Sequence, residues 1–300
     1  MDGTLERQIQ ISDVSRLLGI PVPTIRSWER RYGFPAPGRT QGRHRRYSPE
    51  EIELLRAIRD EITRGHAASE AVRIVTERGR HGASPPTEYL DQLVAGAMAL
   101  DPERVRRTLD AATDTLGAEA AICDVALPAM REIGSRWSTG TCDVAHEHLA
   151  TTAVRGWLGR LASTAPPPDR PPIVLACGPK DLHAIGLEAF GVLLARRGWA
   201  VRQLGALTPT TAIVRAVVET RARGAVVTSQ RGVTRRAAVE SIEAVAALTG
   251  VAAFYAGDAF AAASARRDVP GVYLGIDLTD ATRTIERTVG DGRSGLARPA

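Results

Sequence analysis

One histidine in the C-terminal third of the chain has the neighbours that a metal ligand needs. Asp181 and His183 are separated by one residue, and Gly186 completes the pattern D-x-H-x-x-G. An aspartate two residues away can hold one ring nitrogen while the other nitrogen binds a metal. A lone histidine in a loop is more often structural. The pattern therefore predicts a ligand only if other features support it.

A second group of side chains lies near the junction of two expected helices, 118–137 and 144–163. Trp137 would end the first helix, and Glu147 and His148 would lie in the first turns of the second. The connection is short, so all three could face one pocket. His146 and His148 point to different sides of a helix, unlike the i, i+4 histidines of a zinc protease. Taken alone, the trio is more simply explained as a capped surface turn.

The third chemical feature is a cluster of positive charge near the N-terminus. The chain carries a net charge of +5, and only Lys180 among its 39 basic residues is not arginine. Between positions 26 and 46 there are seven arginines and one acid, Glu29. Such a cluster beside aromatic residues indicates a phosphate-binding surface. A merely solvated face would usually interleave more acidic residues.

Other residue types narrow the class of protein. The three cysteines, Cys123, Cys142 and Cys177, are scattered, which argues against a disulfide framework or a zinc site with C-x-x-C spacing. No apolar run approaches the roughly 18 residues of a membrane span, and residues 1–10 lack the apolar core of a signal peptide. We therefore expect a cytoplasmic protein with no membrane segment.

The elements that position the arginines read as two short helices and a hairpin. Ser12 and Asp13 can cap a helix at 14–18 that Gly19 ends, and a second helix follows from Pro23 and Thr24 to Tyr32. This helix–turn–helix plan has Ile25 and Trp28 available to the core. Glycines and arginines at 34–47 predict a hairpin or wing. A long helix then begins at Ser48-Pro49.

Apolar spacing predicts two further segments after linkers at 79–86 and 163–172. The first, 84–163, has four helices and fits a four-helix bundle. The second, 170–300, alternates short apolar strands with helices, which is typical of a doubly wound parallel sheet with ligands at the carboxyl ends of its strands. The expected strands are 173–176, 200–204, 225–229, 251–255 and 272–276. The loop after the first strand lacks G-x-G-x-x-G, which argues against a nicotinamide dinucleotide.

Three stretches of the first segment carry a family resemblance. Ile11–Ile20, Thr24–Gly33 and the run from Arg43 through Tyr47 to Glu51 strongly resemble the DNA-binding domain of the MerR family over about residues 9–75. The resemblance implies a winged helix-turn-helix, dimeric binding to double-stranded operator DNA, and a recognition helix in the major groove. It makes DNA-contact candidates of Thr24, Arg26, Arg30 and Arg31 on the helix and of Arg39, Arg43, Arg45 and Tyr47 on the wing.

The D-x-H-x-x-G loop resembles the cobalamin-binding motif of flavodoxin-like domains. This resemblance implies that His183 is the lower cobalt ligand, that Asp181 is its partner, and that Gly186 leaves room for the nucleotide tail. The later serine of the motif matches Ser229. The late Gly-Gly pair is matched only as Ala256-Gly257, and Arg231 adds charge near a mostly apolar tail tunnel.

The bundle signature connects the two resemblances. Trp137, nine residues, then Glu147-His148 resembles the W-x9-E-H signature of the CarH/LitR-type light-responsive regulators. The resemblance implies that Trp137 packs over the 5′-deoxyadenosyl group of adenosylcobalamin, that Glu147 accepts hydrogen bonds from the ribose, and that His148 lines the same pocket. Some relatives have a histidine directly after the tryptophan; here the residue is Ser138.

Together the resemblances predict three domains: a winged helix-turn-helix at 1–80, a four-helix bundle at 84–163 and a flavodoxin-like, doubly wound parallel sheet at 170–300. They imply a repressor, not an enzyme. Adenosylcobalamin would stabilise a DNA-bound dimer or tetramer in the dark, and light would break the cobalt–carbon bond and release the operator.

Two alternatives remain open. A MerR-like regulator could have a C-terminal domain that no longer needs cobalamin or that senses another ligand, which the changes at Ser138 and Ala256 would favour. A corrinoid subunit of a methyltransferase or mutase would share the bundle and sheet, but the arginine-rich N-terminal segment argues against it.

Overall fold

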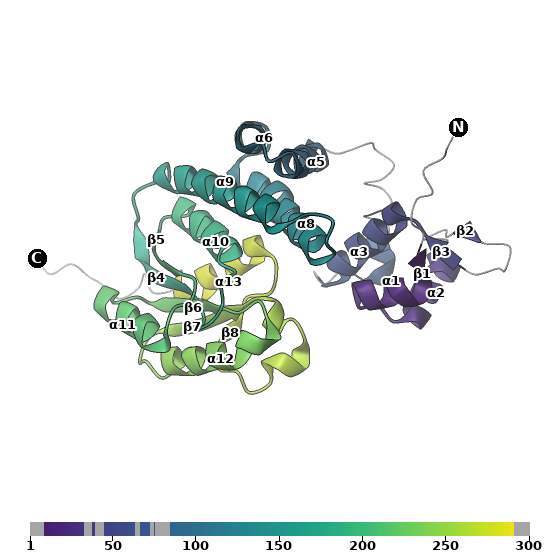
Figure 1. Cartoon of the computed structure of the whole chain (residues 1–300). Helices are drawn as coiled ribbons and strands as arrows, with labels where there is room; N and C mark the ends of the chain where they lie inside the picture. The colour runs from purple at the N-terminus through teal and green to yellow at the C-terminus, as the bar shows by residue number, and fades with distance from the viewer. Residues whose placement is uncertain are drawn as a thin grey trace, which may run out of the picture. The chain divides into compact units, whose positions relative to one another are not determined.

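The computed structural model describes residues 9–32, 38–39, 45–63, 67–72, 75 and 85–290. The chain forms two compact units, Met1–Ser84 and Pro85–Ala300 (Figure 1). Within the described ranges, no helix is long and apolar enough to cross a membrane. The predicted linker at 79–86 lies mostly outside the described residues.

The first unit contains the predicted helix–turn–helix. Helix α1 (Ile11–Leu18) ends at Gly19, whose φ of 66° is left-handed, and α2 (Val22–Tyr32) follows. The predicted cap at Ser12-Asp13 is wrong, because α1 begins at Ile11 directly after strand β1 (Ile9–Gln10). Pairing of β1 with a later strand sets where the chain turns into the helix, and local capping propensity does not decide it.

The wing strands and the third helix complete this unit. Strands β2 (Gly38–Arg39) and β3 (Arg45–Tyr47) are antiparallel, which confirms the predicted hairpin, and β1 pairs with the other edge of β3. Helix α3 (Pro49–Thr63) begins with the predicted capping box: the Glu51 amide donates to Ser48 Oγ, and the Ser48 amide donates to Glu51 Oε2. Trp28 is buried in the core, as predicted.

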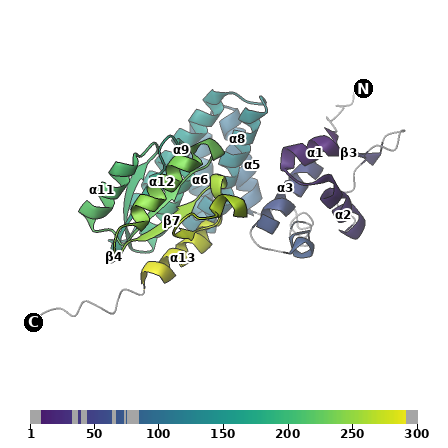
Figure 2. The ribbon, with the colours of Figure 1, turned by 90° about the horizontal axis from the view of Figure 1, so that it is seen from below.

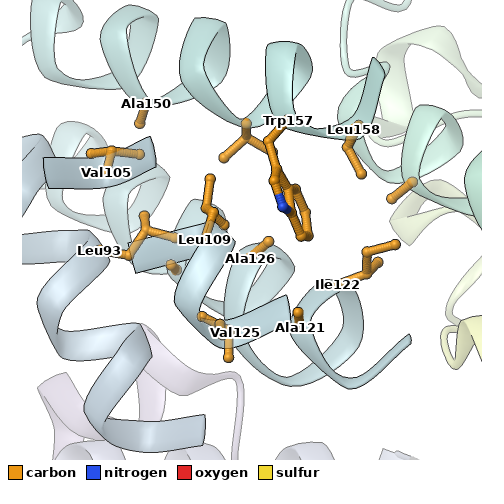
Figure 3. Close-up of a cluster of buried hydrophobic side chains, with 14 of the residues drawn as sticks. Leu93, Val105, Leu109, Ala121, Ile122, Val125, Ala126, Ala150, Trp157 and Leu158 are labelled. Atoms are coloured by element: carbon orange, nitrogen blue, oxygen red, sulfur yellow. The ribbon is translucent and has the colours of Figure 1, made fainter. Parts of the chain in front are cut away.

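The second unit begins with the predicted bundle. Its helices are α5 (Pro85–Met98), α6 (Pro102–Leu116), a composite third helix and α9 (Val144–Ser163). Asp101 and Asp143 cap α6 and α9 as the sequence predicts. Trp157 of α9 projects into the bundle core (Figure 3) and its indole N–H donates to Thr113 Oγ1 at 3.1 Å, so its one polar atom is satisfied.

The third bundle helix is less regular than expected. The sequence predicts one helix at 118–137, and the structure divides it into α7 (Ala118–Ala120), a π-helical segment η1 (Ala121–Ala126) and α8 (Leu127–Ser138). Pro128 lies in the first turn of α8. A proline lacks the N–H of a regular helical bond and clashes with the preceding turn, and the wider π turn relieves that clash.

The sheet has five parallel strands, as predicted. They are β4 (Arg170–Cys177), β5 (Trp199–Gly205), β6 (Gly224–Thr228), β7 (Ala252–Ala256) and β8 (Val272–Tyr273), in the order β5-β4-β6-β7-β8. Helices α10 (Ile185–Arg196) and α13 (Leu278–Gly290) cover one face; α11 (Thr210–Thr220) and α12 (Gly232–Ala246) cover the other (Figure 1). Figure 2 looks from the side of α11 and α12.

Helix α10 joins the bundle to the sheet. Phe190 and Leu194 face the sheet core, while Val192 and Leu193 belong to the bundle core, so the helix is buried on both sides (Figure 1). Polar contacts flank this seam. Arg155 of α9 pairs with Glu188 of α10, and Glu119 of α7 accepts from Arg197 and from Thr279 of α13. The predicted segments 84–163 and 170–300 thus pack as one unit.

Candidate functional site

The strand order creates a switch point beside the predicted ligand. Strand β4 lies between β5 and β6. The connection after β4 leads to β5 on one side, and the connection after β6 leads to β7 on the other, so the two leave in opposite directions. Ligands of open parallel sheets bind at such points, beyond the carboxyl ends of the strands. The loop after β4 contains Asp181 and His183, and the loop after β6 begins at Ser229.

His183 is held by a buried carboxylate. Its Nδ1 lies 2.8 Å from Oδ1 of Asp181, and its backbone N–H donates to the same oxygen at 3.0 Å. The Asp181 side chain is 1% exposed, whereas that of His183 is 54% exposed. An imidazole whose Nδ1 is bound by a carboxylate can present Nε2 to a metal, which is the arrangement that the spacing predicts.

The loop after β6 is bonded to this pair and, on its other side, to the end of β7. The backbone N–H of Gln230 donates to Asp181 Oδ2 at 2.6 Å, and the backbone N–H of Ser229 donates to the carbonyl of Ala256. Gly257 follows with φ of 106°, and a Cβ there would collide with the backbone carbonyl of Ser229. Only glycine fits this close approach. The predicted residues Asp181, His183, Ser229 and Gly257 therefore gather at adjacent strand ends.

Ser229 does not lie on the surface of this site. Its side chain is completely buried, and its hydroxyl is 2.7 Å from Thr234 Oγ1. The structure places it beneath the loop after β6, where it fixes the start of α12. Ser229 remains a predicted residue of the cofactor site, and in this structure its hydroxyl bonds Thr234.

Exposed large apolar side chains lie at the same carboxyl edge of the sheet as His183. Leu182 is 67% exposed, Leu207 is 50% exposed and Val233 is 84% exposed, and they follow three different strands. Gly186, in the first turn of α10, would have open space within 4 Å of an added Cβ. Exposed large apolar side chains around one imidazole suit a broad, largely apolar ligand.

The thiol nearest to the site is inert. Cys177 ends β4, and burial raises the pKa of its thiol to about 11. The Sγ–H points to the carbonyl of His183 at 3.8 Å. A protonated, buried thiol packs as a small apolar side chain, and it offers no thiolate ligand at neutral pH.

The bundle presents its predicted residues on the α8–α9 connection. Trp137 is 52% exposed in the last turn of α8, and Gly140, with φ of 73°, closes a turn in which the Thr141 amide donates to the carbonyl of Arg136. This Schellman-type ending fixes where the indole emerges. An indole this exposed has apolar area available to a ligand.

Glu147 and His148 lie near the start of α9, one turn after its first residue, Val144. Thr151 donates its hydroxyl proton to Glu147 Oε1 at 2.8 Å, and His148 Nε2 lies 3.6 Å from Glu147 Oε2. The His148 side chain is exposed. His146 contacts the Asp143 carboxylate at the helix start, and this contact lowers the pKa of Asp143. His146 is thus engaged in capping.

The predicted recognition helix exposes its cations. In α2, Arg26, Arg30 and Arg31 are exposed and Thr24 is half-buried, while Ile25 and Trp28 face the core. One helix therefore has a buried apolar face and an exposed cationic face. A helix that enters the major groove between two phosphate backbones requires this division. Arg43 lies outside the described residues, as do the side chains of Arg39 and Arg45.

Tyr47 is the exception among the predicted DNA contacts. It is completely buried in the core of the first unit, and its hydroxyl donates to Glu29 Oε1. The prediction of a surface contact is corrected, because β3 lies between β1 and β2 and turns this ring inward. Tyr47 joins the wing to α2 and helps to place the helix.

The donor set fits a cobalt corrinoid. It combines a carboxylate-held imidazole, an apolar rim, an open glycine at the start of α10 and a glycine cradle after β7. Two residues that sequence reasoning did not assign also belong here: Gln230, which bonds Asp181, and Thr151, which bonds Glu147. Gln230 directly follows Ser229, and Thr151 lies one helical turn after Glu147; this proximity to motif residues is the signal that the sequence offers.

Comparison with family models supports both halves of this description. Residues 9–77 match the model "MerR HTH family regulatory protein", and residues 89–162 match the model "B12 binding domain". These matches confirm the predicted helix-turn-helix and identify the bundle as part of a cobalamin-binding region.

Two curated relatives match most of the chain. The HTH-type transcriptional repressor CarA of Myxococcus xanthus is 38% identical over 218 residues, 71% of this chain and 73% of that protein. The HTH-type transcriptional repressor CarH of the same organism is 33% identical over 229 residues, 72% of this chain and 77% of that protein.

A solved structure shares the fold. The monomethylamine corrinoid protein of Methanosarcina barkeri aligns with a TM-score of 0.55 and 12% identity, and covers 67% of this chain and 98% of that chain. The predicted combination of helices and a parallel sheet is confirmed.

Proposed function

Since the chain belongs to the family of the HTH-type transcriptional repressors CarA and CarH, we propose that it represses transcription from operator DNA under the control of adenosylcobalamin and light. The proposal has two parts: a MerR-type unit that binds DNA and a second unit that binds the cofactor. The observation that carries it is the His183–Asp181 pair at the switch point of the sheet.

His183 would hold cobalt through Nε2, with Asp181 fixing the ring. Gly186 would leave space for the nucleotide tail, and Gly257 would keep the β7 loop close to the β6 loop. When bound, the cofactor supplies a cobalt–carbon bond that light can break. The chain's own contribution is to hold the corrin edge and to present an apolar surface around it.

The bundle residues would respond to the organic group on the upper face. Trp137 would stack on the adenosyl group, Glu147 would accept from its ribose, and His148 would line the same pocket. After illumination these side chains would lose their ligand, and the dark dimer or tetramer would no longer be favoured. Because residue 138 is a serine, this position would supply no second imidazole for cobalt. Its hydroxyl instead donates to the carbonyl of Ser135.

Arg26, Arg30 and Arg31 would bind phosphates or base edges of the operator. Most contacts of this kind grip the backbone, and a minority read sequence. Two copies of the helix, presented by an oligomer, would reach successive major grooves. Loss of the oligomer would therefore weaken binding without any change in the helix itself.

The test uses the full-length protein loaded with adenosylcobalamin in the dark. We expect a retained cobalt spectrum that changes irreversibly on illumination, a larger species by size-exclusion chromatography in the dark, and binding to operator fragments selected from random DNA that illumination weakens. His183→Ala should reduce cofactor retention while leaving the first unit folded. Retention equal to that of the wild type would refute the assigned ligand.

A cobalamin-independent regulator is the second candidate, and Ala256 and Ser138 favour it because both depart from the resembled motifs. A colourless protein that still binds the selected DNA, equally in light and dark, would support this candidate. The hypothesis that the chain is a corrinoid subunit of a methyltransferase has less support, because CarA and CarH are transcriptional repressors.

A further inference from the structure

Gln230 connects three loops at the carboxyl edge of the sheet, and the function proposed above does not use it. Its backbone N–H donates to Asp181 Oδ2 at 2.6 Å, which joins the β6 loop to the β4 loop. Its side-chain Oε1 accepts from the Asp258 amide at 3.2 Å, which joins the β6 loop to the β7 loop. One residue thus bonds to both neighbours at once.

The first of these bonds acts on the carboxylate that holds His183. Asp181 Oδ1 serves His183, and Oδ2 accepts from Gln230. The carboxylate is almost completely buried, whereas the imidazole is half-exposed. The orientation of the ring therefore depends on where the carboxylate lies, and Gln230 fixes one of its two oxygens.

The second bond fixes Gln230 itself. Asp258 begins the short 3₁₀ helix η2 (Asp258–Phe260), directly after Gly257. Two backbone bonds already join these loops, from the Ser229 amide to Ala256 and from the Ala259 amide to Ser229. The Gln230 side chain adds a third bond and ends next to Gly257.

We propose that Gln230 is a positioning residue for His183: it transmits the placement of the β7 loop, through Asp181, to the imidazole that ligates cobalt. The inference rests on the proposed function, in which His183 is that ligand. It predicts that the Gly257 loop and the metal ligand are coupled, although their side chains belong to different strand connections.

Two pairs of variants test the bond between the Gln230 side chain and the Asp258 N–H, one pair at each end. In each pair one variant breaks the bond and the other retains it. Gln230→Met removes the acceptor with little change in volume, and Gln230→Glu retains an acceptor. Asp258→Pro removes the donating N–H at the first position of η2, where proline is tolerated, and Asp258→Ala retains it. Arg236→Met, at a 93% exposed side chain paired with Glu240, is the surface control.

The readout is the fraction of bound cobalamin that carries a histidine nitrogen on cobalt. It is measured from the absorbance of the loaded dark protein and, after anaerobic photolysis, from nitrogen splitting in the Co(II) electron paramagnetic resonance spectrum with ¹⁵N-histidine. We expect Gln230→Met and Asp258→Pro each to lower the ratio of ligated to unligated cobalt by about 3- to 10-fold, the range of one lost hydrogen bond. Gln230→Glu, Asp258→Ala and Arg236→Met should stay near wild type.

The outcomes separate this inference from the proposed function. A wild-type protein without histidine ligation overturns both. If the wild-type protein shows histidine ligation, and both members of each pair give the same ratio of ligated to unligated cobalt, only the role of Gln230 is overturned. If one disruptive variant does not fold, as judged by its far-ultraviolet circular dichroism, the other pair decides. A ratio that falls in both members of the pair that folds indicates general damage and also counts against the inference.

Discussion

Substituting Gly186 by alanine should stabilise the protein without cofactor and weaken its binding to cobalamin. Gly186 lies in the first turn of α10, and an added Cβ would meet no atom within 4 Å. Replacing an open helical glycine by alanine contributes about 0.5–1 kcal/mol of stability. That free energy corresponds to a rise in Tm of about 1–4 °C for a unit of this size.

Cofactor binding should change in the opposite direction. If the nucleotide tail passes Gly186, the same methyl group intrudes on it, and overpacking of one methyl costs about 1–3 kcal/mol, or roughly a 5- to 150-fold loss in affinity. Gly159→Ala is the matched control, because Gly159 is also helical, lies in α9 and has open space around an added Cβ. It should be stabilising and leave affinity unchanged.

The assay combines thermal unfolding of the apoprotein, followed by circular dichroism, with equilibrium titration of adenosylcobalamin in the dark. Both variants should raise Tm, and only Gly186→Ala should raise the Kd. If Gly186→Ala stabilises the apoprotein and binds cobalamin as tightly as the control does, the tail does not pass this glycine, and the assignment of Gly186 is refuted.

Three further changes test other parts of the structure. Gly257→Ala should cost about 3 kcal/mol or more in urea unfolding, because the residue combines a positive φ with a collision against the carbonyl of Ser229; an unchanged midpoint would contradict that close approach. Arg30→Ala should lower the slope of log affinity against log salt by about 0.9 in DNA binding, since it removes one phosphate contact, and an unaltered slope would reject the contact. Thr151→Val should weaken adenosylcobalamin binding about 3- to 10-fold and leave the affinity for methylcobalamin unchanged, because Glu147 loses its hydroxyl partner. Thr151→Ser should restore the affinity for adenosylcobalamin. An equal loss of affinity for both cofactors would show a general defect instead.

The sequence predicted the elements well where the local signal is strong. The strand and helix order of residues 170–290, the capping residues Asp101 and Asp143 and the capping box at Ser48 all agree with the structure. These features depend on side chains within a few residues of one another, so spacing along the chain contains the information. The π-helical segment before Pro128 was missed, because a proline in a helical pattern does not say how the turn adapts.

Burial was predicted less well where distant segments decide it. Tyr47 and Ser229 both match motif positions, yet both side chains are completely buried. Tyr47 is covered because β3 lies between two strands, and Ser229 because α12 begins against it. The spacing of a motif along the chain does not say how deeply each of its residues is buried.

The sequence by itself determined the types of chemistry: an aspartate two residues from a histidine, a tryptophan ahead of a glutamate, and arginines concentrated beside one helix. Only the tertiary structure decided which groups work together. It placed the Gln230 amide on Asp181 and the Asp258 amide on Gln230, although these residues follow three different strands. The physical reason is that parallel pairing brings the carboxyl ends of distant strands to one edge, where hydrogen-bond distances replace sequence distances.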